Sequence, residues 1–332
     1  MAEAVARPEP AASILVAAHN AAAFLDGAVS SALAQTRRDV EVVAVDDASS
    51  DATPEVLAEW ARRDGRLTVL RHDRRRGAAA ARNTAIEAAR GRWLAVLDAD
   101  DALLPERIER LVPMAEAAGA DLFADNLIER DFASGARLGK TLPAAEMAAS
   151  AAGPVGLAEM LRRDRVDQPG RAKFGYLKPI VRRDFLLRSG VRYRPEIEVG
   201  EDFLFYVECV AAGGRFWVTP EAFYLYSVRE GSASSSGGAL HLSAATRRMR
   251  GLLHRRGDPE LDALLRQRQR ATDSDCFDLA VEGRRLGDAF RYACWADPAR
   301  VARRLGSAAG AVRRRFSGRR PNGAAAAGDG RR

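Results

Sequence analysis

The stretch Trp93-Leu94-Ala95-Val96-Leu97-Asp98-Ala99-Asp100-Asp101 joins an apolar run of strand length to three closely spaced acids. Tryptophan, leucine and valine suit a buried strand, and α/β folds place ligands at the carboxyl ends of parallel strands. Side chains two positions apart share one side of an extended chain, so Asp98 and Asp100 can meet one cation. Their oxygens suit Mg²⁺ or Mn²⁺, which usually takes further ligands from water and a substrate diphosphate. The alternative is an acidic turn that closes the strand.

Strands and helices alternate on the N-terminal side of this stretch. Short, nearly continuous apolar runs predict the strands, and apolar residues at helical spacing predict the helices between them. The predicted strands cover 13–18, 40–45, 67–70 and 93–98, and the predicted helices cover 21–35, 53–63 and 78–89. Repeated βαβ units form a parallel sheet, and continuously apolar strands are covered on both faces. The sequence therefore predicts an α/β fold with a Rossmann-like, mostly parallel sheet flanked by helices.

Polar side chains follow three of these four strands. His19 and Asn20 end the first strand, Asp46 and Asp47 end the second, and Asp98 ends the fourth. The carboxyl ends of neighbouring parallel strands lie at the same edge of a sheet. We therefore expect these three polar clusters to converge on one cleft.

The pattern is less regular after residue 101. A helix is expected at 105–118 and a strand at 120–124, whereas 129–167 shows no clear period and is interpreted as either a substrate-facing insertion or a surface excursion. Glu201 and Asp202 stand at the head of an apolar helix, where they either complement the helix dipole or place a carboxylate at the cleft. Arg229 stands in a loop, as a solvated cation or a bidentate partner of a diphosphate. The other predicted elements are strands at 215–218 and 222–226 and helices at 183–189, 242–255, 259–270, 276–295 and 301–316.

The net charge of +7 is unevenly distributed. Residues 300–332 hold ten arginines and one aspartate, a net +9, so the preceding 299 residues sum to −2. This near-neutral body argues against nucleic acid as a partner, because nucleic-acid-binding domains carry basic patches. The basic end has two interpretations. It is either an amphipathic helix on the inner face of the cytoplasmic membrane, or an exposed helix followed by a disordered tail.

Cysteine usage and hydropathy indicate the compartment. The three cysteines, Cys209, Cys276 and Cys294, are far apart and form no Cys-x-x-Cys pair, which fits a reducing compartment and argues against a disulfide framework or structural zinc. No apolar run reaches the roughly 18 residues of a membrane span, and the first 12 residues lack the pattern of a signal peptide. We therefore expect a cytoplasmic protein.

Six short motifs, read in order, resemble those of family 2 glycosyltransferases with the GT-A fold. The resemblance covers about residues 12–235, and six motifs in the right order are far more specific than any one of them. The motifs are the 13–20 strand, Ala32-Leu33-Ala34-Gln35-Thr36, Val45-Asp46-Asp47-Ala48-Ser49-Ser50-Asp51, Gly77 with Ala81-Arg82-Asn83, Leu97-Asp98-Ala99-Asp100-Asp101 and Gly200-Glu201-Asp202. Blocks at 175–179, 200–203 and 224–232 also resemble bacterial exopolysaccharide enzymes of the succinoglycan type.

The resemblance implies a role for each matching residue. Asp202 would be the general base that deprotonates the acceptor hydroxyl. Asp98 and Asp100 would form the D-x-D motif, which contacts the ribose and holds Mg²⁺ or Mn²⁺ on the diphosphate. The other implied nucleotide-sugar contacts divide by the part of the donor they meet. Ala17, His19 and Asn20 would lie beside the base and ribose, Asp47 would bind the base, and Asp98 would contact the ribose. Gly77, Arg82 and Arg229 would lie toward the phosphates or the loops over them. His19 departs from the family, which usually has an aromatic residue there, although an imidazole can still stack on a base.

The implied activity is an inverting, metal-dependent transfer of a hexose from a nucleotide-sugar, with UDP-glucose the expected donor. The expected acceptor is a hydroxyl of a growing exopolysaccharide or other cell-surface glycan, carried on a lipid-linked oligosaccharide or polysaccharide. The implied domains are a disordered N-terminus at 1–11, a GT-A domain at 12–235, a helical C-terminal region at 236–316 and a disordered basic tail at 317–332.

Three other functions are possible for this kind of sheet. A non-catalytic nucleotide-sugar-binding protein is one alternative, although the retained acids argue against it. A sugar-nucleotide pyrophosphorylase would carry a glycine-rich loop with Arg and Lys after the first strand, but His19-Asn20-Ala21-Ala22-Ala23 stands there. A dinucleotide-binding oxidoreductase would need G-x-G-x-x-G at the same place, and this motif is absent.

Overall fold

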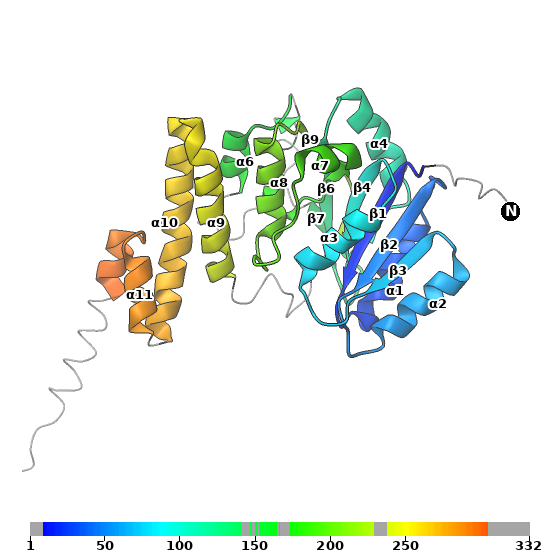
Figure 1. Ribbon diagram of the computed structural model, residues 1–332, viewed down its shortest axis with the longest axis horizontal. Helices are drawn as coiled ribbons and strands as arrows, with labels where there is room; N and C mark the ends of the chain where they lie inside the picture. Colours follow the sequence, from blue (N-terminus) through cyan, green and yellow to red (C-terminus); the bar gives the residue numbers. More distant parts are fainter. Residues whose placement is uncertain are drawn as a thin grey trace, which may run out of the picture. The chain divides into compact units, whose positions relative to one another are not determined.

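Figure 1 shows the computed structural model of the chain, which describes residues 9–140, 147, 150–151, 153–164, 166, 173–228, 238–283 and 285–304. The chain divides into two compact units between Arg268 and Gln269. Within the described residues, no helix is long and apolar enough to cross a membrane. The domain boundaries expected from the sequence stay predictions, and both predicted disordered ends lie largely outside the described residues.

Four parallel strands form the N-terminal half of the sheet, as the apolar runs predicted. They are β1 (Ala12–Ala18), β2 (Val40–Asp46), β3 (Leu67–Arg71) and β4 (Trp93–Asp98). β1 lies between β2 and β4, and β3 lies outside β2. In this register Ala17 of β1 pairs with Val45 on one side and with Asp98 on the other. The polar residues that follow β1, β2 and β4 therefore lie at one edge of the sheet.

Three helices connect these strands, also as predicted. They are α1 (Ala22–Leu33), α2 (Thr53–Arg63) and α3 (Ala78–Ala88). Crossovers between parallel strands are right-handed, so α3, which returns from β3 to β4, lies on the opposite face of the sheet from α1 and α2 (Figure 1). Ala81 and Ala85 of α3 are fully buried. Their small side chains let the helix backbone, and with it Arg82, approach β1 and β2 closely.

The other half of the sheet is mixed rather than parallel. Its strands are β5 (Ala102–Leu103), β6 (Leu122–Asp131), β7 (Arg137–Lys140), β8 (Ile180–Arg182) and β9 (Phe216–Val228). The strand order is β3-β2-β1-β4-β8-β6-β9-β5, with β7 beside β6. β8 is antiparallel to both β4 and β6, whereas β6 and β9 are parallel. The insertion of β8 places Lys178, which precedes this strand, next to the end of β4.

The single strand β9 corrects the prediction of two strands at 215–218 and 222–226. The residues 219–221, which separate the two predicted strands, stay within β9. They are accommodated because the register of β9 against β6 shifts on each side of Asn126. Such irregularities let a strand accommodate extra residues and bend. β6 also continues to Asp131, into the segment 129–167, where the sequence predicted no regular secondary structure. Much of that segment lies outside the described residues.

Helices α4 (Arg107–Ala117), α6 (Leu157–Arg163), α7 (Arg183–Ser189) and α8 (Glu201–Ala211), with the 3₁₀ helix η1 (Phe174–Tyr176), complete this part of the fold. The predicted helices at 105–118 and 183–189 correspond to α4 and α7. α8 is buried from Asp202 to Cys209, and Phe203 and Tyr206 on this helix belong to the hydrophobic core. Its position is therefore fixed by packing along most of its length.

The C-terminal part is helical, as predicted, but its helix boundaries differ. It contains α9 (Ala239–Leu253), the 3₁₀ helix η3 (His254–Arg256), α10 (Pro259–Glu282) and α11 (Leu286–Ala293). The break predicted between residues 270 and 276 is absent, because α10 continues through these polar residues. The helix predicted at 276–295 is therefore divided between the end of α10 and α11. Thr272 and Ser274 donate their hydroxyls to carbonyls within the same helix, so these polar residues do not end it. Most of the helix predicted at 301–316 lies outside the described residues.

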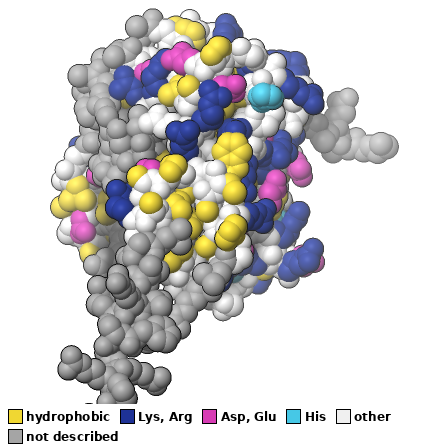
Figure 2. Space-filling model, turned by 90° about the vertical axis from the view of Figure 1, so that its left-hand side faces the viewer, with side chains coloured by type: hydrophobic (Ala, Val, Ile, Leu, Met, Phe, Trp, Pro, Cys, Tyr) yellow, Lys and Arg dark blue, Asp and Glu magenta, His cyan; other side chains and the backbone are white. Residues whose placement is uncertain are grey.

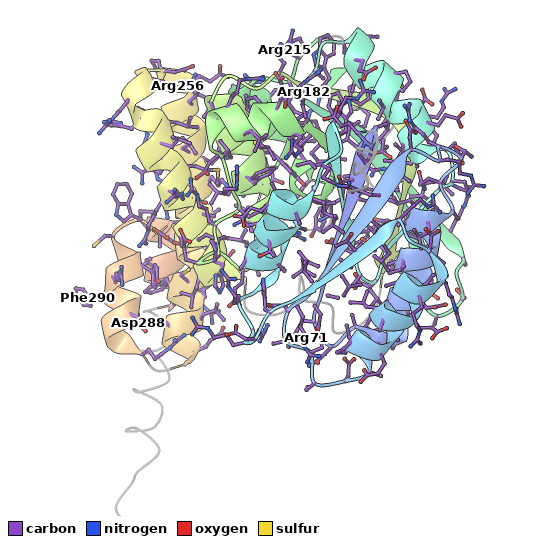
Figure 3. The ribbon with its side chains drawn as sticks, turned by 45° about the vertical axis from the view of Figure 1, so that its right-hand side comes forward. Arg71, Arg182, Arg215, Arg256, Asp288 and Phe290 are labelled. Carbon is purple, nitrogen blue, oxygen red and sulfur yellow. The ribbon has the colours of Figure 1, made fainter. Side chains whose placement is uncertain are left out.

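Apolar and basic side chains are mixed on part of the surface. Figure 2 shows arginine and lysine side chains among apolar ones on the face it draws. In the second unit, Phe290 of α11 (labelled in Figure 3) is 82% exposed and Trp295 is also exposed.

Candidate active site

Five charged side chains meet at the carboxyl end of β4. Arg82 donates from Nη2 to Oδ1 of Asp98 at 2.8 Å. Its Nη1 donates to Oε1 of Glu201 at 2.7 Å and to Oδ1 of Asp202 at 3.0 Å. Lys178 Nζ lies 2.5 Å from Oδ2 of Asp202 and 2.9 Å from Oδ2 of Asp98. Two cations thus hold three acids, and such pairing is what allows charges to be buried.

The pairing fixes the charge state of this five-residue cluster. Burial alone would raise the pKa of the Asp98 carboxyl, but the charges of Lys178 and Arg82 outweigh burial and hold that pKa below its usual value. Burial would lower the pKa of the Lys178 ammonium, but Asp202 and Asp98 raise that pKa well above its usual value. Asp98 is therefore ionised and Lys178 protonated at neutral pH. Glu201 differs, because burial and the charge of Asp202 raise its pKa.

Glycine at position 200 places the acids at the start of α8. Gly200 has a φ of 81°, in the left-handed region that favours glycine, and a Cβ there would lie 2.8 Å from Cδ2 of Leu242. The chain can therefore turn sharply into the helix. Glu201 and Asp202 occupy the first turn, where the helix dipole stabilises carboxylates. These acids complement the helix dipole and also face Arg82, and the interpretation that one of them stands at the cleft stays a prediction.

Lys178 was not predicted as a site residue. The block 175–179, which contains Lys178, was interpreted only through its family resemblance. A lysine between apolar neighbours is itself a sign of a buried, paired charge. Lys178 is 5% exposed, and the adjacent Leu177 is fully buried. A lysine in such a position needs acidic partners, because an unpaired buried ammonium is costly. The hydroxyl of Tyr206 donates to the Leu177 carbonyl at 2.7 Å and holds this segment against α8.

Asp101, the third acid of the opening stretch, ties the D-x-D turn to β9. Its Oδ2 accepts the hydroxyl of Tyr224 at 2.7 Å, and its Oδ1 accepts the backbone N–H of Ser227 at 2.7 Å. The Tyr224 oxygen in turn accepts the backbone N–H of Asp98 at 3.1 Å. Burial, together with the charges of Asp98 and Asp100, raises the pKa of Asp101 to about 8. Asp101 therefore positions the turn, a role that the spacing of the acids alone did not predict.

Asp47 organises the loop that leads into α3. Its Oδ1 lies 2.6 Å from Nδ1 of His72, and its two oxygens accept the backbone N–H groups of Arg76 and Gly77 at 2.7 to 3.1 Å. His72 also contacts Oγ1 of Thr84 through Nε2 at 3.0 Å. Gly77 has a φ of 87° and directly precedes α3. The predicted contact of Asp47 with a nucleotide base stays a prediction, and the structure adds a positioning role for its carboxylate.

The remaining predicted donor-binding residues follow β1. His19 Nδ1 lies 2.8 Å from the Asp47 carbonyl, and Asn20, with a φ of 49°, accepts the backbone N–H of Ser50 at 2.9 Å. Ala17 lies between Val45 and Asp98 in the sheet. Arg71, at the end of β3 (Figure 3), lies 3.2 Å from Oδ2 of Asp46. The expected convergence of the strand ends is thus present, whereas Arg229 lies outside the described residues.

Comparison with known proteins shows the family of the N-terminal domain. Residues 13–146 match the family described as Glycosyl transferase family 2. This chain carries a family 2 glycosyltransferase domain. It is 41% identical over 227 residues to the succinoglycan biosynthesis protein ExoO of Rhizobium meliloti and 35% identical over 229 residues to ExoU of the same organism. These alignments cover 68% and 67% of this chain, and 63% and 64% of the relatives, so the match spans slightly less than two thirds of their length.

The fold of the family 2 domain agrees with that of solved GT-A glycosyltransferases. The structure of S. aureus TarS 1–349 in complex with UDP-GlcNAc aligns with a TM-score of 0.65 at 20% sequence identity, over 85% of this chain and 79% of that one. At this identity the likeness concerns the fold. It confirms the predicted GT-A architecture, a curled α/β sheet flanked by helices with further helices at the C-terminal end.

The family 2 domain also offers ligands that fit a divalent cation. Among the described residues, no group of three or more His, Cys, Asp or Glu side chains is arranged to hold a metal. Both oxygens of Asp98 are engaged by Arg82 and Lys178, and the side chains of Asp98 and Asp100 are both partly exposed. Mg²⁺ is commonly held by one or two carboxylates together with substrate phosphates. The D-x-D pair fits that description.

Proposed function

We propose that this chain is an inverting glycosyltransferase that moves a hexose from a nucleotide-sugar, UDP-glucose foremost, to a hydroxyl of a growing exopolysaccharide or other cell-surface glycan. The observation that carries the proposal is the placement of Asp202 beside Asp98. Lys178 bridges the two carboxylates, so the acid proposed as base lies next to the acid proposed on the donor side. The names of ExoO and ExoU, both succinoglycan biosynthesis proteins, support a polysaccharide product.

In the proposed reaction, the acceptor oxygen attacks the anomeric carbon opposite the diphosphate. The new carbon–oxygen bond forms as the bond to the leaving diphosphate breaks, and the hydroxyl proton passes to Asp202. A carboxylate oxygen accepts more than one hydrogen bond, so the hydroxyl can bind Asp202 while Arg82 keeps the side chain oriented. General bases of this kind contribute roughly 10²- to 10⁴-fold to a rate.

Mg²⁺ or Mn²⁺ is the proposed cofactor, held by Asp100 with Asp98 beside it. Such an ion, when bound, neutralises negative charge that develops on the leaving diphosphate. This chain's own residues supply the rest. Asp47 and His72 order the loop before α3, and Arg82 and Lys178 fix the two carboxylates. The predicted contacts of Ala17, His19, Asn20 and Arg229 with the donor belong to the same proposal.

The proposed acceptor is a lipid-linked oligosaccharide or polysaccharide, met at the inner face of the cytoplasmic membrane. The exposed Phe290 and Trp295 and the arginines after residue 300 support peripheral contact with an anionic surface. Nucleic acid is not a proposed partner, because the charge of the body is near neutral. Deleting residues 300–332 is expected to reduce co-sedimentation with anionic vesicles, and unchanged sedimentation would contradict the membrane contact.

Donor binding and turnover test the proposal in two steps. A thermal-shift screen of UDP-, GDP-, dTDP- and CDP-sugars with and without Mn²⁺ should show one metal-dependent rise in melting temperature, because a ligand of the folded state stabilises it. Asp202→Asn should then lose roughly 10²- to 10⁴-fold in transfer while keeping donor binding. Glu201→Gln is the matched control and should lose much less. Donor binding without turnover in the native chain would instead indicate a non-catalytic nucleotide-sugar-binding protein.

A further inference from the structure

A pocket of about 510 Å³ lies in the first unit between α8 and α9. Its size falls within the range of roughly 300–1,000 Å³ that is usual for small-molecule sites. Glu208 of α8 lines it, six residues after Asp202, and so about 9 Å farther along the helix at 1.5 Å per residue. Six residues also turn the helix to another face, so this pocket is separate from the five-residue cluster.

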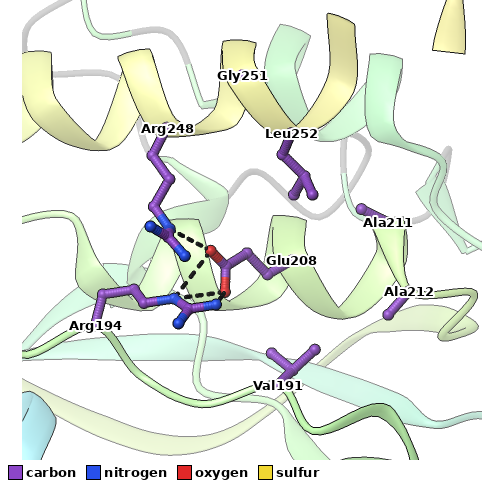
Figure 4. Close-up of a pocket in the computed structure, with 8 residues that line it drawn as sticks. All are labelled: Val191, Arg194, Glu208, Ala211, Ala212, Arg248, Gly251 and Leu252. Carbon is purple, nitrogen blue, oxygen red and sulfur yellow. Dashed lines mark hydrogen bonds and ion pairs between the residues drawn. The ribbon is translucent and has the colours of Figure 1, made fainter. Parts of the chain in front are cut away.

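The pocket has a charged end. Arg194 donates from Nε and Nη2 to the carboxylate of Glu208 at 2.8 to 3.1 Å, and Arg248 donates from Nε to Oε1 of Glu208 at 2.7 Å (Figure 4). Glu208 is 6% exposed, whereas the side chains of Arg194 and Arg248 are 33% and 40% exposed. The carboxylate is therefore enclosed, and the two guanidinium groups reach the opening.

Two acids face the two arginines at this end. Glu208 is buried between them, and Glu196 lies 3.9 Å from Nη1 of Arg248, so the charges balance. The arginines nevertheless have more N–H donors than these two carboxylates engage. Within the described residues, Nη1 of Arg194 and Nη2 of Arg248 make no further hydrogen bond. These donors suit a phosphate or carboxylate, which guanidinium groups bind with paired hydrogen bonds.

The other end of the pocket is apolar. Val191, Ala211 and Leu252 form its walls, and Figure 4 shows the Leu252 side chain directed toward the end of α8. Gly251 also lines the pocket, and a Cβ at this position would meet no heavy atom within 4 Å. The absence of a side chain at Gly251 thus keeps part of the space open.

We propose that this pocket binds an amphipathic anion, one phosphate or carboxylate group carrying a short hydrocarbon chain. The anionic group pairs with Arg194 and Arg248, and the chain lies against Val191, Ala211 and Leu252. The site bridges α9 and the helix that carries Asp202. The pocket contains none of the residues proposed above to contact the donor or the acceptor. Ligand binding to the pocket can therefore be measured without a sugar-transfer assay.

Octyl phosphate is the probe, titrated calorimetrically into the full chain below its micelle concentration. The expected result is saturable binding of one molecule per chain. Inorganic phosphate and octanol, which supply the head group and the tail alone, should each bind at least tenfold more weakly. Octanoate compares a carboxylate head group with a phosphate, and saturable binding of either amphiphile supports the proposal.

Two variants and two matched controls locate the site. Gly251→Leu should weaken octyl phosphate binding at least tenfold by filling the pocket, and the open space there leaves the fold intact. Arg248→Gln should do the same by removing one guanidinium while the Arg194–Glu208 pair remains. Gly27→Leu, at an open position of α1, and Arg255→Gln, an exposed arginine of η3, should bind as the native chain does. Undiminished binding by Gly251→Leu or Arg248→Gln, or no saturable binding by the native chain, would overturn the proposal.

Discussion

The ammonium of Lys178 lies 2.5 Å from the carboxylate of Asp202, and both side chains are buried. The same ammonium lies 2.9 Å from Asp98. One cation therefore joins the acid at the end of β4 to the acid at the start of α8. Lys178 therefore holds the acid proposed on the donor side next to the acid proposed as the base.

Replacing Lys178 with methionine should impair transfer by disturbing both carboxylates. We expect kcat/KM to fall about tenfold or more, since misplacing a catalytic group by as little as about 1 Å can cost roughly 100-fold in rate. Loss of the ammonium should also raise the pKa of Asp98, which Lys178 and Arg82 hold below its usual value. The acid limb of the pH profile of kcat/KM should therefore move to higher pH.

The control for this prediction is Lys173→Met, which removes a nearby, less buried lysine. Lys178→Arg keeps the charge and should restore part of the activity. An unchanged pH profile in Lys178→Met would show that the lysine contributes to folding alone.

Replacing Asp101 with asparagine should change how stability depends on pH. Asp101 has a folded-state pKa of about 8, against an ordinary value of 3.8. Between these values the folded protein binds more protons than the unfolded chain, so the contribution of Asp101 to the unfolding free energy falls as pH rises from about 4 to 8. Asparagine does not titrate, so the Asp101→Asn variant lacks this fall in unfolding free energy.

Urea unfolding in the presence of chelator measures this effect. Between pH 6 and pH 9, the unfolding free energy of Asp101→Asn should rise relative to the native chain by roughly 2.5–3 kcal/mol, since the native chain loses about 1.4 kcal/mol per pH unit up to the folded-state pKa of about 8. Parallel stability curves for the two proteins would contradict the raised pKa.

The metal requirement should depend on Asp100. Excess chelator should abolish transfer, and Asp100→Asn should raise the Mn²⁺ concentration for half-maximal activity at least tenfold, because removal of a ligating carboxylate weakens the site. Asp184→Asn, which alters an acid whose side chain is 72% exposed on α7, should leave the Mn²⁺ response unchanged. Full transfer activity in excess chelator would end the proposal of a metal cofactor.

The pair formed by Arg107 and Asp125 should dominate the stability of the mixed half of the sheet. Both side chains are fully buried, with Nη2 of Arg107 2.8 Å from Oδ1 of Asp125. Arg107→Met should lower the unfolding free energy by about 3–5 kcal/mol, because Asp125 is left as an uncompensated buried charge. On the same helix, Arg110→Met breaks an exposed pair with Glu221 and should cost about 1 kcal/mol or less. Equal losses in urea unfolding would contradict this distinction.

The sequence by itself determined the local structure and the shared edge of the parallel strands. Apolar runs and helical spacing are properties of neighbouring residues, so β1 to β4 and the helices between them could be predicted. The rule that ligands gather at the carboxyl ends of parallel strands then grouped Asn20, Asp47 and Asp98. The motif order placed Asp202 in the same site through family resemblance.

Only the tertiary structure decided which charges pair. Arg82 and Asp202 are 120 positions apart in the sequence, and Lys178 reaches them because β8 inserts antiparallel beside β4. No periodicity signals such contacts, since electrostatic pairing depends on distance in space and on burial, not on sequence separation. The roles of Lys178 and Asp101 follow from that arrangement, as does the pocket between α8 and α9, because each is built from segments that meet only when the chain has folded.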